Sequence, residues 1–303
     1  MTSARPAPIW RSMLFVPVNV PRFVDSGTRA GADAIILDLE DSIPEREKAA
    51  ARALIPAAAA KVAAGGSDVI VRINRSLRTA IRDIETAIGP DVAALMLPKV
   101  ESGQHVQLLS EAIEEVERER RMEVGTTRIV LLIETTTAYF SMRDIARAHP
   151  RIAAMSLGAE DFSLACGMMP EPDGLYVPRV HSMIAAREAG IIPLGVLGTH
   201  ADIRDVEGFR AMIRRSKRIG FEGGMCIHPG QIAVLNEEYR PAADDVAKAE
   251  RVVAAGLEAE RAGRGSVSVD GRMVDVPIIE RAKALIARDA AIRRQEQRRA
   301  GNG

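Results

Sequence analysis

The sequence predicts an α/β protein, a (β/α)8 TIM barrel with a C-terminal helical lid, and three observations support this fold class. Eight short apolar runs alternate with longer segments of helical periodicity. Most runs are unbroken, as expected for strands buried on both faces of a parallel sheet. The 303 residues exceed the roughly 200–250 that such a barrel needs. A doubly wound sheet is the alternative, but no G-x-G-x-x-G motif follows the first run.

The eight predicted strands share an apolar, β-branched composition. They are residues 12–17, 33–39, 68–73, 93–98, 128–134, 152–157, 192–197 and 225–227. Between them, residues 45–64, 102–121 and 206–219 have the composition or periodicity of helices. In residues 102–121, for example, Val106, Leu109, Ile113 and Val116 fall on one helical face.

The pattern changes after Gln231. Residues 244–263 and 278–294 predict two helices, separated by a Gly-rich turn and a strand-like pair around Asp270 and Gly271. We therefore predict a catalytic barrel over residues 1–235 and a lid or oligomerisation segment over residues 236–303.

Composition narrows the classes of function. The chain has 41 basic and 41 acidic residues, so its zero net charge gives no attraction for nucleic acid or anionic lipid. No apolar run approaches the ~20 residues of a membrane helix, and the N-terminal stretch has no signal-peptide pattern. Two cysteines exclude a disulfide framework. We expect a cytoplasmic protein that binds neither nucleic acid nor membrane.

Barrel enzymes place their chemistry at the carboxyl ends of the strands, and this sequence has charged residues there. Glu134 and Asp161 follow two consecutive predicted strands. Two converging carboxylates, with no His or Cys close by in sequence, suit a hard cation such as Mg²⁺. The structural alternative is that Thr135 or Asp161 caps the following helix.

Arg72 lies at the carboxyl end of the third predicted strand. A buried arginine needs an anion, and that anion is either a substrate carboxylate or oxyanion, or a structural partner such as Glu40 or Glu101. Asp38 and Glu40 lie on one face of the second strand, while Asp41 either reaches the barrel mouth or begins a turn before Pro44.

The histidines and cysteines carry weaker signals. His228, at the last strand end, and His200, in a Gly-Thr-His loop, are more readily explained as hydrogen-bonded structural residues than as catalytic bases. Cys166 and Cys226 have no charged activator nearby in sequence, and we interpret both as packing residues.

The chain resembles the citrate lyase β-subunit family, which also contains malyl-CoA and citramalyl-CoA lyases and belongs to the HpcH/HpaI aldolase superfamily. The resemblance covers nearly the whole chain. It begins with RSMLFVPVNVPRFVDSGTRAGADAIILDLEDSIPEREKAAAR and continues through VRIN, LMLPKVES, LLIETTTA, SLGAEDF, GGMCIHPGQI and MVDVP. It implies a (β/α)8 barrel with a C-terminal lid that assembles as a homotrimer or hexamer with shared active sites.

The resemblance also implies roles for individual residues. Glu134 and Asp161 would hold Mg²⁺, and Arg72 would contact the substrate and steady a thioester enolate. Asp275 would come from a neighbouring subunit's lid and act on the acetyl carbon. The acids Asp38, Glu40 and Asp41 would lie near the mouth of the site. Basic residues near the first two strands would hold coenzyme A, and the candidates are Arg11, Arg22 and Lys48.

The implied reaction is a Mg²⁺-dependent cleavage, or formation, of a 3-hydroxyacyl-CoA such as malyl-, citramalyl- or citryl-CoA. Its partners are a short acyl-CoA and a 2-oxo acid. Departures from the family occur in PLGVLGTHADIRD, where glycines and His200 replace much of an acidic pattern, and at Gly224, where many members have lysine. These departures leave the substrate open. A thioesterase, a metal-dependent 2-oxo acid aldolase acting without CoA, and an inactive scaffold are the alternatives; an acyl-carrier partner stays undetermined.

Overall fold

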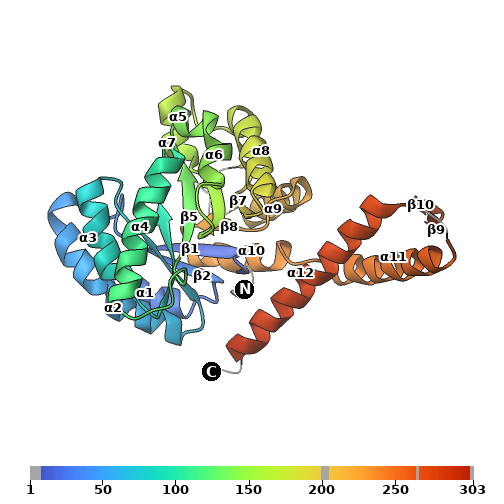
Figure 1. Ribbon diagram of the computed structural model, residues 1–303, viewed down its shortest axis with the longest axis horizontal. Coiled ribbons are helices and arrows are strands. Elements are labelled where there is room, and N and C mark those ends of the chain that lie inside the picture. Colours follow the sequence, from blue (N-terminus) through green and yellow to red (C-terminus); the bar gives the residue numbers. More distant parts are fainter. Residues whose placement is uncertain (1–7, 199–204, 264–265, 301–303) are drawn as a thin grey trace. The chain divides into compact units, whose positions relative to one another are not determined.

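The computed structural model describes residues 8–198, 205–263 and 266–300, which form two compact units, residues 1–239 and 240–303. The first unit contains a single sheet of eight parallel strands in the order β7-β6-β5-β4-β3-β2-β1-β8 (Figure 1). The strands are β1 Ser12–Pro17, β2 Ala34–Asp38, β3 Asp68–Arg72, β4 Val92–Leu97, β5 Arg128–Ile133, β6 Ile152–Leu157, β7 Ile192–Leu194 and β8 Gly224–Cys226. A bridge between Leu194 and Gly223 brings the two ends of the sheet together. The predicted barrel is confirmed.

Helices follow the strands and surround the sheet (Figure 1). In the first unit they are α1 Pro21–Thr28, α2 Lys48–Ala64, α3 Leu77–Ala87, α4 Gly103–Glu119, α5 Thr136–Phe140, α6 Met142–Ala146, α7 Ala159–Cys166, α8 Pro172–Glu188, α9 Val206–Ile219 and α10 Ile232–Glu238, with 3-10 turns Glu45–Glu47 and Pro229–Gln231. The bounds predicted for the two shortest strands of the barrel, β7 and β8, are wrong by one to three residues. Residues 192–197 are a strand only to Leu194, and the last strand begins one residue earlier, at Gly224.

Alternation along each strand divides the apolar core into two layers. Ala34 and Ile36 of β2 belong to the cluster inside the barrel, whereas Ile35 and Leu37 pack against the helices. Both faces are dry, which explains why the strands are unbroken apolar runs. This packing fixes the strand directions and therefore the positions of the residues that follow each strand.

The second unit is a helical hairpin closed by a short β-ribbon. It consists of α11 Ala243–Arg261, β9 Val267–Val269, β10 Arg272–Val274 and α12 Val276–Ala300. Asp270 and Gly271 form the ribbon turn with φ of 50° and 74°, the positive values that tight hairpins require. At Gly256 the helices approach closely, because an added Cβ would lie 2.6 Å from Ile279 Cδ1.

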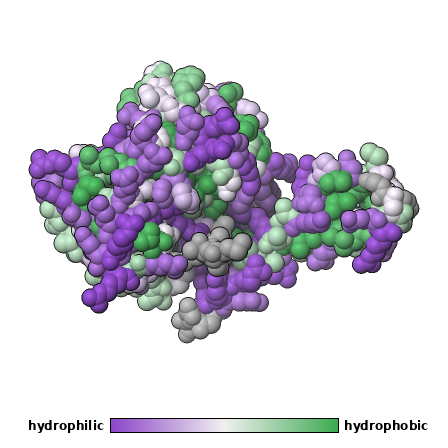
Figure 2. Space-filling view, in the orientation of Figure 1, coloured by the Kyte–Doolittle hydropathy of each residue, from purple (hydrophilic) through white to green (hydrophobic). Residues whose placement is uncertain are grey.

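The surface is mainly polar with scattered hydrophobic groups (Figure 2). Among the described helices, none combines the length and apolar character that crossing a membrane requires. The most exposed large apolar residues of the barrel are Phe140 on α5 and Leu164 on α7, both at least 80% exposed.

Candidate active site

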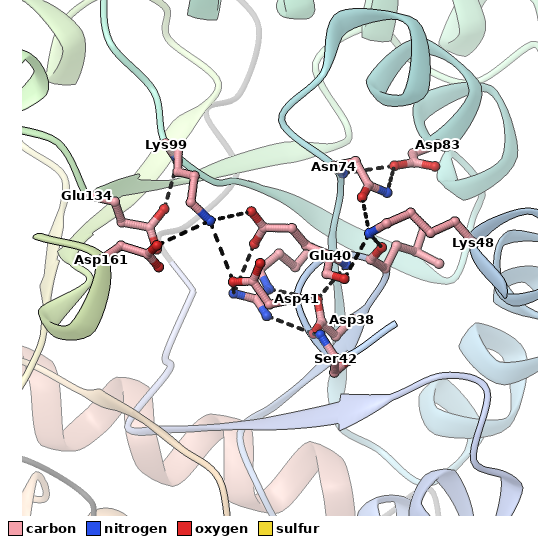
Figure 3. Close-up of polar contacts among 12 residues, drawn as sticks. Asp38, Glu40, Asp41, Ser42, Lys48, Asn74, Asp83, Lys99, Glu134 and Asp161 are labelled. Carbon is pink, nitrogen blue, oxygen red and sulfur yellow. Dashed lines mark hydrogen bonds and ion pairs between the residues drawn. The ribbon is translucent and has the colours of Figure 1, made fainter. Parts of the chain in front are cut away.

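The charged side chains predicted from the barrel strands gather where the carboxyl ends of β2 to β6 meet (Figure 3). A cavity of about 410 Å³ lies there, and its lining includes Asp41, Arg72, Glu134 and Asp161. The cavity belongs entirely to the first unit. Strand order brings these residues together across more than 100 positions of sequence.

Arg72 is held rigidly at the end of β3. Its Nε and Nη2 donate to the two oxygens of Asp38, both at 2.7 Å, in a forked pair. Its Nη1 lies 3.1 Å from Glu40 Oε2 and 3.5 Å from Asp41 Oδ2. The guanidinium carbon lies 4.8 Å from the centre of the Phe15 ring. Arg72 therefore has a structural pair on one edge and faces the cavity with the rest.

Asp38 is fully occupied by holding Arg72. Besides the arginine, its oxygens accept the backbone N–H groups of Glu40, at 2.9 Å, and Ser42, at 3.1 Å. Burial by itself would raise the pKa of Asp38, but these hydrogen bonds and the charge of Arg72 outweigh burial and hold the pKa below its ordinary value. The Asp38 carboxylate therefore orients the arginine.

Lys99 lies between the carboxylates that follow β2, those of Glu40 and Asp41, and the carboxylates of Glu134 and Asp161. Its Nζ lies 2.8 Å from Glu40 Oε1, 3.5 Å from Asp41 Oδ2 and 3.6 Å from Asp161 Oδ1, and Figure 3 shows it among them. Its backbone N–H donates to Glu134 Oε2 at 2.7 Å. Lys99 has a φ of 48°, a conformation that costs energy for a residue other than glycine and that directs both its amide and its ammonium into the site.

Glu134 follows β5 and is only 4% exposed. Burial, together with the negative charges of Glu40 and Asp161, raises its pKa to about 7, against the opposing effects of Lys99. The carboxylate lies against Gly158, where an added Cβ would stand 2.6 Å from Glu134 Oε1. Glycine at this position therefore leaves room for the carboxylate to face Asp161, at the start of α7.

The charge balance of this cluster favours a cation. Glu40, Asp41, Glu134 and Asp161 meet with Lys99, while Arg72 is already neutralised by Asp38. In the described residues, no three His, Cys, Asp or Glu side chains are placed to hold a metal ion together. A two-carboxylate site fits Mg²⁺, which keeps several waters and takes substrate oxygens as its other ligands. Glu134 and Asp161 fit that requirement.

A hydrogen-bond network behind the cavity fixes the loop that carries Glu40. Lys48 Nζ donates to the carbonyl oxygens of Leu39 and Glu40 at 3.0 and 2.9 Å, and to Asn74 Oδ1 at 2.5 Å. Asn74 in turn donates through its side-chain amide to Asp83 at 2.7 Å. Lys48, one of the coenzyme A candidates, is thus engaged in holding the site's own backbone (Figure 3).

The prediction that Arg11 helps to hold coenzyme A is wrong. It precedes β1 at the amino end of the barrel, opposite the cavity, is 3% exposed and pairs with Asp33 at 2.8 Å. Its position next to the first strand suggested proximity to the site, but it lies at the wrong end of that strand. Arg22, on α1, stays exposed, stacks on Phe23 at 4.9 Å and retains its candidacy.

The histidines and cysteines, which carried weaker signals in the sequence, have different outcomes in the structure. His228 accepts the backbone N–H of Gly230 at 3.1 Å and caps a 3-10 turn, the structural interpretation. Cys226 is buried, and burial raises its pKa to about 12. Cys166 is exposed on α7, so its interpretation as a packing residue is wrong. His200 lies outside the described residues.

Asp275 belongs to the second unit. It directly precedes α12, where its carbonyl oxygen accepts the N–H groups of Ile278 and Ile279, and its Oδ1 lies 3.4 Å from the N–H of Ile278. Within its own chain, therefore, Asp275 occupies the N-cap position of a helix.

Two residues of the site, Lys99 and Arg179, were not predicted from the sequence. Lys99 stands at a strand end, which was the signal used for the others, but its role depends on a positive φ that the sequence does not reveal. Arg179 of α8 also lines the cavity. It occupies the buried stripe of that helix with Leu175, Ser182 and Ala186, and an arginine in such a stripe is a detectable signal.

The fold and this cluster define an α/β-barrel enzyme whose site combines paired carboxylates with a fixed arginine. Residues 11–229 match the family model HpcH/HpaI aldolase/citrate lyase, and the chain belongs to this family. Membership makes it a carbon–carbon lyase.

The similarity to known proteins extends over most of this chain and most of each relative. The chain is 35% identical to citrate lyase subunit beta of Leuconostoc mesenteroides, over 91% of this chain and 92% of the relative. It is 33% identical to L-malyl-CoA/beta-methylmalyl-CoA lyase of Cereibacter sphaeroides, over 91% and 93%. Among solved structures, CitE of Mycobacterium tuberculosis in complex with magnesium, acetoacetate and coenzyme A has a TM-score of 0.73 and 31% identity, over 94% and 99%.

Proposed function

We propose that the protein is a Mg²⁺-dependent lyase that cleaves a 3-hydroxyacyl-CoA into a short acyl-CoA and a 2-oxo acid, or catalyses the reverse condensation. The observation that carries this proposal is the meeting of Glu134 and Asp161 with Arg72 in one cavity. Magnesium in the solved relatives and the CoA esters in the names of the malyl-CoA lyases support it.

Glu134 and Asp161 would hold the metal. When bound, Mg²⁺ supplies Lewis-acid stabilisation of the negative charge that develops on the substrate hydroxyl as it becomes a ketone. Glu134 is suited to this role because its burial disfavours the anion unless a cation is close, as its pKa of about 7 indicates. Lys99 orients Glu134 through its backbone N–H and stays protonated beside Asp161.

Arg72 would bind the thioester oxygen. In cleavage, the bond between the hydroxyl-bearing carbon and the carbon next to the thioester breaks, and its electron pair forms a thioester enolate. The Nη1 group of Arg72 would stabilise this oxygen, because Asp38 already fixes the opposite edge of the guanidinium. We therefore assign to Asp38 the role of positioning Arg72. Glu40, which lies next to Arg72, would help to bind the substrate.

Two acids would move protons. Asp41 is 57% exposed, lies within 3.5 Å of both Arg72 and Lys99, and can accept the hydroxyl proton at the cavity lining. Asp275 would return a proton to the enolate carbon, and in condensation it would remove that proton. We place Asp275 in the site of a neighbouring subunit, in a homotrimer or hexamer.

The test is an assay with a panel of acyl-CoA and 2-oxo acid pairs, with Mg²⁺ and with excess EDTA. Formation of a 3-hydroxyacyl-CoA that requires Mg²⁺, without release of free thiol, is the expected result. Release of free CoA as the first product would favour a thioesterase. Condensation of 2-oxo acids with carbonyl partners that carry no CoA would favour an aldolase, and either outcome would overturn the proposal.

A further inference from the structure

Asp83 is a fully buried carboxylate that lies outside the active-site cavity. It belongs to α3, is 0% exposed and does not line the cavity. Its Oδ1 accepts the Nε–H of Arg52 at 2.6 Å. Its Oδ2 accepts both the backbone N–H and the side-chain amide of Asn74, at 2.8 and 2.7 Å. A buried charge costs free energy that a neutral side chain of the same shape would avoid, so its partners indicate what the charge does.

The charge of Asp83 sets the orientation of the Asn74 amide. A carboxylate only accepts hydrogen bonds, and an ammonium group only donates them. Asn74 stands between one of each, because its NH₂ group donates to Asp83 and its Oδ1 accepts from Lys48 Nζ at 2.5 Å (Figure 3). With these two neighbours, only one orientation of the amide satisfies both. Asp83 therefore makes Asn74 present its oxygen to Lys48.

Lys48 transmits this constraint to the active site. Its Nζ also donates to the carbonyl oxygens of Leu39 and Glu40. These carbonyls belong to the two planar peptide groups on either side of the Glu40 Cα, so holding both fixes the direction in which the Glu40 side chain leaves the backbone. That side chain lies 3.1 Å from Arg72 Nη1 and 2.8 Å from Lys99 Nζ.

We propose that Asp83 is a positioning residue for the reaction, although it lies outside the cavity. It acts through a relay of two residues, Asn74 and Lys48, on the loop that carries Glu40 and Asp41. The expected effect on rate rests on the proposed function, in which both of these acids act on the substrate. The expected effect on the loop depends on no reaction.

Asp83→Asn tests the relay, because it removes the charge and keeps the shape. Its amide has one accepting and one donating end, whereas Arg52 and Asn74 both donate to this position. The charged guanidinium forms the stronger hydrogen bond with the oxygen, so the new NH₂ group turns to Asn74 and breaks the relay. We expect kcat to fall by about 10- to 100-fold, since a displacement of about 1 Å in a site can cost about 100-fold. Steady-state kinetics on fully folded protein measure the loss.

Native-state hydrogen exchange reports on the loop without any reaction. The backbone N–H groups of Glu40, Ser42 and Ile43 are hydrogen-bonded. In Asp83→Asn they should exchange about 10- to 100-fold faster, the effect expected for a lost hydrogen bond to a charged group.

Asn74→Leu provides a second variant that breaks the same relay. It leaves the ion pair between Asp83 and Arg52 in place, so the buried charge keeps its partner. It should lower kcat and speed the exchange of the loop as Asp83→Asn does, and it tests the proposal even if Asp83→Asn does not fold.

Asp33→Asn is the matched control. Asp33 is equally buried and also accepts from an arginine and a backbone N–H, but it lies at the amino end of the barrel. This variant should lower the unfolding temperature and leave kcat per folded molecule and the exchange of the loop unchanged. The double variant Asp83→Asn/Lys48→Met should lose no more kcat than Lys48→Met alone, because both substitutions break one relay.

Three results would overturn the assignment: wild-type kcat and exchange in Asp83→Asn, losses of kcat that multiply in the double variant, or an equal loss of kcat in Asp33→Asn. Faster exchange of the loop in a protein without lyase activity would reject the proposed function and retain Asp83 as the residue that positions the loop. Lyase turnover with unchanged exchange in Asp83→Asn and Asn74→Leu would reject Asp83 alone.

Discussion

The two ends of the barrel use charge in opposite ways. At the amino end, Arg11 and Asp33 are 3% and 0% exposed, and Arg151 and Glu117 are 2% and 0% exposed. Each carboxylate also accepts backbone N–H groups, so both charges of each pair are balanced within the protein, and only Arg151 Nε of the four side chains is buried without a hydrogen-bond partner among the described residues. At the carboxyl end, Glu134 has a raised pKa, and Arg179 Nη1 is buried without a hydrogen-bond partner among the described residues.

This difference separates stability from function. Charges whose partners are built in hold the barrel together, whereas charges left incompletely matched need an external ligand. Substitutions at the amino end should therefore lower stability and spare the chemistry. Substitutions at the carboxyl end should impair the chemistry and spare the stability.

Glu134→Gln should have the largest effect on rate. It removes a proposed metal ligand, and metal charge stabilisation is worth several kcal/mol, or roughly a thousandfold in turnover. Its unfolding temperature should not fall, because a buried carboxylate with an unfavourable charge is replaced by a neutral amide. Steady-state rates and a Mg²⁺ titration by calorimetry check this. Glu101→Gln, at an exposed ion pair with Arg75, is the control and should keep both activity and metal binding.

Glu117→Gln should give the opposite result at the amino end. Arg151 would lose its buried partner, which costs about 3–5 kcal/mol of unfolding free energy. Chemical denaturation measures that loss. The rate per folded molecule should equal that of the wild type, and a lower kcat in fully folded protein would contradict the separation of the two ends.

If Arg72 acts as an oxyanion donor, Arg72→Lys should raise the activation free energy by about 3 kcal/mol and lower the turnover accordingly. A lysine cannot fork onto Asp38 and at the same time direct a second N–H into the cavity. Steady-state kinetics give the loss, and Arg11→Lys at the amino end is the matched control for the same exchange. A near wild-type rate in Arg72→Lys would leave only the structural pair with Asp38.

The sequence predicted the barrel well because the signal is local. Each strand is buried on both faces, so its apolar run is continuous and is readable without knowledge of its partners. It also located Glu134, Asp161 and Arg72, since residues directly after parallel strands must converge. Of the two structural partners that the sequence offered for Arg72, Glu40 is confirmed, whereas Glu101 pairs with Arg75; the forked pair of Arg72 with Asp38 was not predicted.

What escaped prediction depends on backbone conformation or on contacts distant in sequence. Lys99 reaches Glu40 and Asp161 because of its positive φ, and no sequence pattern specified that. Arg11 was placed near the site because the end of the strand at which it lies was ignored. Arg179 lies within a helix, where strand-end reasoning does not apply, and the missing partner that makes it informative is visible only in three dimensions.

The metal-free protein should lose stability as pH rises from about 4.5 to about 7. The pKa of Glu134 is about 7 when folded, against an ordinary value of 4.5 in the unfolded chain. Between these values the folded state binds more protons than the unfolded state, so the contribution of this group falls with rising pH and levels off above 7. Thermal unfolding in EDTA should show this component, and Glu134→Gln should lack it. Identical pH profiles would show that Glu134 titrates normally.

The smallest effect is expected from mixing subunits, and it tests whether Asp275 acts on a neighbouring barrel. Asp275→Asn removes the acid, but asparagine can still accept the N–H of Ile278, so the start of α12 is preserved. Arg72→Ala removes the proposed enolate donor from the barrel. Each variant alone should be inactive.

After subunit exchange at equal amounts, a site made from two different chains combines a native Arg72 with a native Asp275 in about a quarter of cases. A site made from one chain never contains both, because every chain carries one of the two substitutions. Recovery approaching about a quarter of the wild-type rate is therefore expected only if the site is shared between subunits. Mass spectrometry of isotope-labelled subunits would verify the exchange. Complete exchange without recovered turnover would show that Asp275 serves its own barrel or takes no part in the reaction.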